Sequence, residues 1–201
     1  MFTSKKNSDI SQGDVANDSS INTTVHIGTH LDMPYHFFDD GQTIEDYNIE
    51  DFRFENILFI DMIPNDIIVK DDLIKILECQ KNKTKYDMLV VKTGICHKRE
   101  QHEFWEKNYG FDPAIADYLR TDFPNIRVIG FDSISVSSFS NRMLGRASHR
   151  AFLDPADPIL LVEDMDLTAL TKDSKIEKLD IAPLRIAKCD GLPCTIIAEV
   201  E

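Results

Sequence analysis

The stretch HIGTHLDMPYHF, residues 26–37, holds three histidines and one aspartate within a dozen residues. Its side chains that can bind a metal all fall on even positions, at His26, His30, Asp32 and His36. An extended chain points such residues to one face. A helix does not fit, because Asp32 would rotate away from His26 and because Gly28 and Pro34 would weaken the helix from inside. The sequence therefore predicts an extended, bent segment.

The residue types in this segment indicate a metal site. Four extended residues span about 13 Å, near the limit at which two imidazoles can hold one ion, and Gly28 can supply the bend that brings His26 and His30 together. Two histidines and an aspartate suit Zn²⁺ or Mn²⁺, with coordination positions left for water. The alternative is a histidine-rich turn whose side chains cap backbone groups. Three histidines on one face, with a carboxylate between two of them, favour the metal.

Further groups for such a site must come from elsewhere in the chain. His149 lies in LGRASHRAFL, ahead of the run DPILLVED (157–164), in which Glu163 is the penultimate residue. A helix and the end of a strand can deliver these two groups to one pocket. His97 and His102 lie in a highly charged stretch, 95–107, that is typical of a solvated helix or loop.

The hydrophobic pattern predicts one α/β domain. Short runs rich in β-branched residues, bounded by Gly, Pro, Asn or Asp, predict buried strands at 56–63, 87–94, 126–136, 157–164 and 193–200. Residues 69–81 and 112–123 have helical apolar spacing between these strands. Residues 1–20 are polar and predict a frayed lead-in or loop, which leaves residues 21–201 as the domain.

The composition argues against several kinds of partner. A formal charge of −13 and a pI near 4.8 disfavour binding to nucleic acid or to an anionic membrane. No run approaches the roughly 20 apolar residues that cross a bilayer, and the first residues lack the apolar core of a secretion signal, so a cytoplasmic protein is expected. The scattered cysteines are expected to be reduced structural thiols: Cys79, Cys96, Cys189 and Cys194.

Segment 26–37 resembles the HxGTHxDxPxH signature of the cyclase family, metal-dependent hydrolases that include bacterial kynurenine formamidases and isatin hydrolases. Later segments resemble the other motifs of this family in the same order: VVKTG (90–94), VIGFDSISV (128–136), HRAFLDPADPILLVED (149–164) and DGLPC (190–194). The resemblance runs from about residue 12 to the C-terminus. Two positions depart from the family pattern, because Lys92 stands where arginine is usual and Thr195 follows DGLPC.

The resemblance implies a set of site residues. A first divalent ion would be held by His26, His30 and Asp32. In two-metal members of the family, Asp32 bridges to a second ion held by His149 and Glu163. His36 is then the expected general base or acid. Glu163 is expected to be both a metal ligand and a catalytic residue. Only 25 residues precede His26, fewer than is usual, which implies that part of the substrate-pocket wall is missing.

The resemblance also implies a fold and an activity. The expected fold is a single α/β domain of the swivelling β/β/α type, with a mixed β-barrel-like sheet and flanking helices, assembled as a homodimer or homotetramer. The expected activity is hydrolysis of an amide-like C–N bond, in an aryl formamide or a lactam, by water activated by one or two Zn²⁺ or Mn²⁺ ions. One alternative is a member of this fold that binds a metal or small molecule without catalysis. Another is a structural member that has lost its chemistry.

Overall fold

A computed structural model describes residues 2–201 of the chain. The strands within these residues are β1 (Thr3–Ser8), β2 (Asp18–Asn22), β3 (His30–Asp32), β4 (Arg53–Phe54), β5 (Ile57–Asp61), β6 (Ile68–Val69), β7 (Met88–Lys92), β8 (Gly110–Phe111), β9 (Val128–Phe131), β10 (Leu160–Glu163), β11 (Ile176–Pro183) and β12 (Gly191–Val200). The α-helices are α1 (Asp71–Glu78), α2 (His102–Glu106), α3 (Ala114–Asp122) and α4 (Arg142–Phe152).

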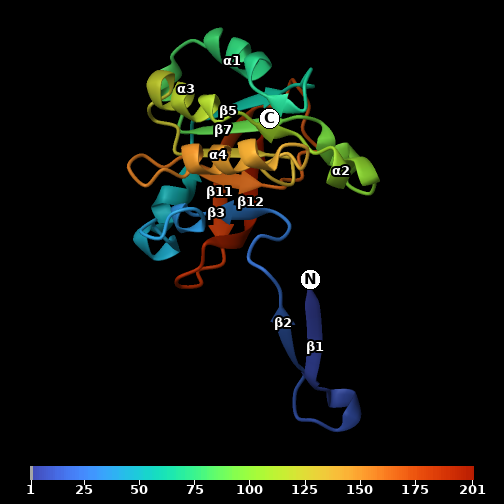
Figure 1. The fold of residues 1–201 in the computed structure, drawn as a ribbon. Coiled ribbons are helices and arrows are strands. Elements are labelled where there is room, and N and C mark those ends of the chain that lie inside the picture. The colour runs from blue at the N-terminus through green and yellow to red at the C-terminus, as the bar shows by residue number, and fades with distance from the viewer. Residues whose placement is uncertain (1) are drawn as a thin grey trace.

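One mixed sheet of eight strands organises the body, in the order β4-β11-β12-β3-β10-β9-β7-β5. Strands β10, β9, β7 and β5 pair in parallel, whereas β3 pairs antiparallel with both β10 and β12. Strand β11 also contacts β5, so the two ends of the sheet approach each other and the sheet nearly closes into a barrel. Figure 1 shows α4 lying across the sheet, with α1 and α3 together beside β5 and β7. The predicted α/β domain with a barrel-like mixed sheet is confirmed.

The apolar runs form the buried centre of this sheet. Strands β7, β9 and β10 are buried at every position, because a parallel strand covered on both faces presents apolar side chains to both. The predicted strands at 56–63, 87–94, 126–136 and 157–164 contain β5, β7, β9 and β10. The predicted helix at 69–81 contains α1, which buries Leu73 and Leu77 one turn apart. The predicted helix at 112–123 contains α3.

Two of the structural predictions are wrong. Residues 3–8 and 18–22 form the hairpin β1–β2, not a frayed or looped segment, and Figure 1 shows this hairpin projecting away from the body. Its strand residues are exposed from Thr3 to Asn7, so no alternation of buried and exposed side chains marks them in the sequence. The predicted strand at 193–200 lies within β12, but the predicted burial is wrong because this strand is mostly exposed. Beyond Pro193 its pairing is with β11 in the described chain, and this ribbon meets solvent.

None of the helices within residues 2–201 combines the length and the apolar character that a membrane span requires. The four cysteines are free thiols in the described chain.

The buried centre of the sheet predicts a large cost for truncating β7. Leu89 is fully buried, so Leu89→Ala should lower the free energy of unfolding by about 2–5 kcal/mol through lost packing and a residual cavity. The matched control is Leu184→Ala, because Leu184 is 55% exposed and should cost less than about 0.5 kcal/mol. Urea unfolding of both variants measures the difference. Equal losses would contradict the assignment of β7 to the core.

Candidate metal centre

Two adjacent strands at the middle of the sheet supply the centre of the site. Strand β3 carries His30 and Asp32 on one face, while Leu31 between them points into the core. Strand β10 runs antiparallel beside β3, and its last residue, Glu163, is paired directly with His30. All three ionisable side chains are buried, with exposed fractions of 4% for His30, 0% for Asp32 and 3% for Glu163. They lie in the buried middle of the sheet.

Helix α4 delivers His149 to the same place. The Asn141 side chain caps the first turn by accepting a hydrogen bond from the Leu144 backbone N–H at 3.1 Å. The buried face of the helix has spacings of three and four residues and consists of Gly145, Ser148, His149 and Phe152. His149 therefore points inward although the helix is rich in charged residues.

The chain bends on both sides of β3. Gly28 adopts the left-handed conformation, with φ of +59°, and its carbonyl accepts a hydrogen bond from His30 Nδ1 at 2.8 Å. The predicted bend at Gly28 is confirmed. The predicted extended backbone is wrong for Pro34–His36, which forms a 3-10 helix started by the proline ring. This turn brings the His36 ring to 4.0 Å from the His26 ring, centroid to centroid.

Asp32 is the centre of the cluster. His26 Nδ1 lies 2.8 Å and His30 Nε2 lies 3.3 Å from Asp32 Oδ1. The other carboxylate oxygen, Oδ2, lies 3.5 Å from His149 Nε2. The ligand atoms of His26, His30 and Asp32 are close enough together to hold one ion.

Glu163 repeats this arrangement with its own two oxygens. Its Oε2 lies 3.5 Å from His30 Nε2, and its Oε1 lies 3.6 Å from His149 Nε2. The backbone N–H of Val136 donates to Oε1 at 2.6 Å, so the VIGFDSISV segment fixes the direction of this carboxylate. Asp32 thus faces three imidazoles and Glu163 faces two of the same three.

A hydrogen-bond acceptor holds the outer nitrogen of each inward-facing imidazole. These acceptors are the Gly28 carbonyl for His30, the Gly145 carbonyl for His149 at 2.9 Å, and Asp190 Oδ2 for His26 at 2.9 Å. In the neutral ring, an outer acceptor of this kind leaves the lone pair on the inward nitrogen, where a metal would bind it. The inward nitrogens all face Asp32.

Two atoms of this cluster lack a partner. His30 Nε2 and Asp32 Oδ2 are buried and make no hydrogen bond with any described residue. An unpaired buried polar atom is costly, and a divalent cation would supply the missing interaction for both. Nitrogen and carboxylate donors in this number suit zinc or manganese. The residues present therefore fit a metal ion.

The charges in the site are strongly coupled. Burial works against the imidazolium of His30, but the Asp32 and Glu163 carboxylates close to its Nε2 outweigh burial and raise the pKa of His30 to about 11. Burial also works against the Asp32 carboxylate, but the three imidazoles around it hold its pKa well below the usual range. For His36 burial is the largest effect and lowers the pKa.

The structure brings the six residues singled out in the sequence into one cluster: His26, His30, Asp32, His36, His149 and Glu163. His102 lies outside it, with its side chain 95% exposed. Sequence reasoning missed Asp190, which contacts both His26 and His36. The signal that could have found it is the DGLPC motif, which begins with this aspartate.

A family model named Cyclase matches residues 3–138 of the chain. Isatin hydrolase A from Labrenzia aggregata, bound to benzyl benzoate, has 19% identity over 98% of this chain and 82% of its own, with a TM-score of 0.78. An isatin hydrolase bound to the product analogue thioisatinate has 19% identity over 100% of this chain and 81% of its own, with a TM-score of 0.75. A predicted metal-dependent hydrolase from Bacillus stearothermophilus has 20% identity over 98% and 86%, with a TM-score of 0.72. At these identities the likeness concerns the fold.

The raised pKa of His30 predicts that metal binding releases protons. In the metal-free protein His30 keeps its proton through neutral pH, and a cation can bind only the neutral ring, so about one proton should leave per ion. Affinity should then rise with pH, about tenfold per pH unit for each proton released. Calorimetric titration with Zn²⁺ in two buffers of different ionisation enthalpy counts these protons. Identical heats in both buffers would contradict the prediction.

Proposed function

The chain belongs to the cyclase family, and from that premise we propose that it is a metal-dependent hydrolase that cleaves an amide-like C–N bond in a small molecule. The observation that carries this proposal is the convergence of three imidazoles on two buried carboxylates. Such a cluster is costly to bury unless each charge is compensated, so its presence supports a role in chemistry.

We propose that the site holds two ions, zinc or manganese. His26, His30 and Asp32 would hold the first, and His149 and Glu163 would hold the second, with Asp32 shared between them. The division is supported by the two oxygens of Asp32, since one faces His26 and His30 and the other faces His149. When bound, the ions supply Lewis acidity that polarises the substrate carbonyl and lowers the pKa of water from 15.7 towards about 7.

His36 is the proposed general base. Its ring borders the cluster, with centroids 4.0 Å from His26 and 5.6 Å from His149. Its Nδ1 donates a hydrogen bond to Asp190 at 2.9 Å, which leaves Nε2 as the atom that can accept a proton. Because burial lowers the pKa of His36, the ring is neutral at neutral pH. It takes the proton of the water that attacks the carbonyl carbon and returns it to the leaving nitrogen as the C–N bond breaks.

Aromatic side chains beside His36 support an aryl substrate. Phe37 stacks on the His149 ring at 4.5 Å and meets the His36 ring edge-on at 4.7 Å. Tyr35 lies on the other side of His36 in the chain and is 41% exposed. Flat apolar surfaces of this kind suit an aryl formamide or a lactam fused to an aromatic ring.

We propose that the chain forms a homo-oligomer through its N-terminal hairpin. An isolated two-stranded hairpin has marginal stability in water, and this one exposes Phe2, Ile10, Val15 and Ile21. It carries two lysines and three aspartates, so it is nearly neutral on a chain of net charge −13 and would be the part least repelled by a second copy. These features support a second copy of the chain as the partner of the hairpin.

We also propose that the protein acts in the cytoplasm. The proposal is supported by four free cysteines, since free thiols are typical of reducing compartments.

The proposed activity is tested with metal-loaded protein on a panel of N-formyl anilines and isatin-like lactams. Turnover is expected, and a chelator should abolish it. His36→Ala should lower kcat by about 10²–10⁴-fold and leave the metal content unchanged, because the ring is a base and not a ligand. His30→Ala should lose metal. The control is His102→Ala, since that side chain is 95% exposed and outside the site.

Two outcomes of this assay would count against the proposal. Full metal content without turnover of any amide or lactam would indicate a binding protein instead of an enzyme. Full turnover by His36→Ala would show that another group is the base.

The proposed assembly is tested by removing residues 2–22. Sedimentation velocity should show a dimer or a larger oligomer for the intact chain and a monomer for the shortened one, because the exposed apolar side chains of the hairpin are lost. Thermal unfolding of the shortened chain serves as the control for a folded body. An unchanged oligomer after removal of the hairpin would contradict this role.

A further inference from the structure

We propose that Asp190 is a positioning residue of this site, because one of its carboxylate oxygens holds both His26 and His36 and so fixes the orientation of both rings and the tautomer of His36. This inference rests on the proposed function and deepens it. It assigns a role to a carboxylate that is neither among the proposed ligands nor the proposed base.

The geometry at Asp190 defines the orientation of two rings at once. Oδ2 lies 2.9 Å from His26 Nε2 and 2.9 Å from His36 Nδ1. A carboxylate can only accept, so both of these nitrogens must carry the proton. His26 also faces Asp32 through Nδ1 at 2.8 Å, so without a metal that nitrogen carries a proton too, and an ion would bind there in place of that proton. The lone pair of His36 is on Nε2.

Among residues 2–201, these two rings have no backbone acceptor of the kind that orients the other two imidazoles. His30 and His149 donate to the carbonyls of Gly28 and Gly145, which the bend before β3 and helix α4 hold in place. His26 Nε2 and His36 Nδ1 instead donate to a side chain, the carboxylate of Asp190. Because one oxygen serves both rings, the position of the base is tied to the position of a proposed ligand.

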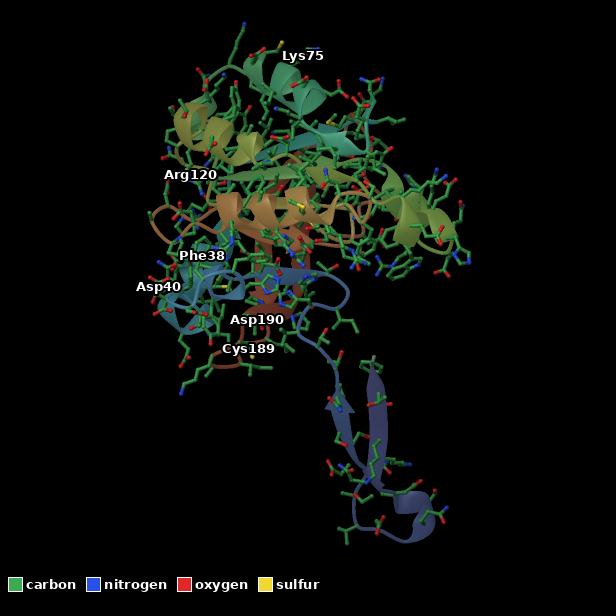
Figure 2. The ribbon with its side chains drawn as sticks, in the orientation of Figure 1. Phe38, Asp40, Lys75, Arg120, Cys189 and Asp190 are labelled. Carbon is green, nitrogen blue, oxygen red and sulfur yellow. The ribbon has the colours of Figure 1, made fainter. Side chains whose placement is uncertain are left out.

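The backbone around Asp190 is itself anchored against β3. The carbonyl of Asp190 accepts a hydrogen bond from the Met33 N–H at 3.1 Å, and Gly191 pairs with Asp32 in the sheet. A Cβ on Gly191 would lie 2.4 Å from Cε1 of His26, so this ring rests directly on bare backbone. Figure 2 shows Asp190 beside β3, at the side of the body that faces the hairpin. Asp190 and Gly191 thus fix the position of the His26 ring together.

Asp190 could instead be a direct ligand, since donor atoms of His26, His36 and Asp190 are also close enough to hold one ion. The geometry of His26 favours the positioning role. This ring already presents its other nitrogen to Asp32 at 2.8 Å, and a neutral imidazole has a single ring-nitrogen lone pair to give to an ion. The two roles differ in metal count, which the second experiment below measures.

The first experiment determines the tautomer of His36 by long-range ¹H–¹⁵N NMR on the metal-free protein at mildly alkaline pH. The wild-type ring should carry its proton on Nδ1. Asp190→Ala should shift the ring towards the Nε2–H form, while the control Asp40→Asn, at an exposed carboxylate four residues from His36, should not. An unchanged tautomer in Asp190→Ala would overturn the proposal. This readout needs neither metal nor substrate, so it stands even if the proposed activity fails.

The second experiment measures kinetics and metal content of the loaded enzyme. Asp190→Ala should lower kcat by about 10–100-fold with little change in KM, and Asp190→Asn, which keeps one acceptor oxygen, should recover part of the loss. Elemental analysis should show the wild-type number of ions in both variants. Loss of an ion from protein kept at saturating metal would indicate that Asp190 is a ligand, and unchanged kcat in both variants would show that it has no role. Either result overturns the proposal while the proposed hydrolase activity stands.

Discussion

The carboxylate of Asp32 is the constraint on which the rest of the site depends. It is fully buried, and a carboxylate removed from water costs several kcal/mol unless partners compensate it. Three imidazoles supply that compensation, which is why the pKa of Asp32 is held well below its usual range while the pKa of His30 is raised to about 11. Removing one imidazole would leave buried charge unpaired. The residues of the cluster are therefore energetically interdependent.

The fold divides the site between a buried part and a more exposed part. His30, Asp32 and Glu163 belong to the two central strands β3 and β10, whose other faces are packed into the core. His36 and Asp190 lie at a turn and at a strand end, with side chains 27% and 40% exposed. Three of the proposed ligands are thus held by buried strands, and the proposed base lies where a substrate can reach it. A single oxygen of Asp190 connects the two parts.

Much of this arrangement could be predicted from the sequence, because it follows from local periodicity. His30 and Asp32 share a face because a strand alternates, and Gly28 bends because glycine alone is unstrained at positive φ. The central strands could be predicted because each is a short apolar run bounded by Gly, Pro, Asn or Asp. The hairpin β1–β2 escaped prediction because its pairing is made by backbone groups of a polar sequence.

Contacts between distant parts of the chain set the limit of that prediction. His36 enters the cluster through a 3-10 turn that replaces strand geometry after Pro34. Asp190 meets His26 across 164 positions of sequence, a contact that no local pattern encodes.

The central claim is that imidazoles 26 and 30 and carboxylate 32 close around a cation, and anomalous diffraction from crystals grown with Zn²⁺ or Mn²⁺ tests it most directly. The account predicts an anomalous peak bounded by His26 Nδ1, His30 Nε2 and Asp32 Oδ1. Crystals with ordered side chains here and no anomalous peak among them would contradict it.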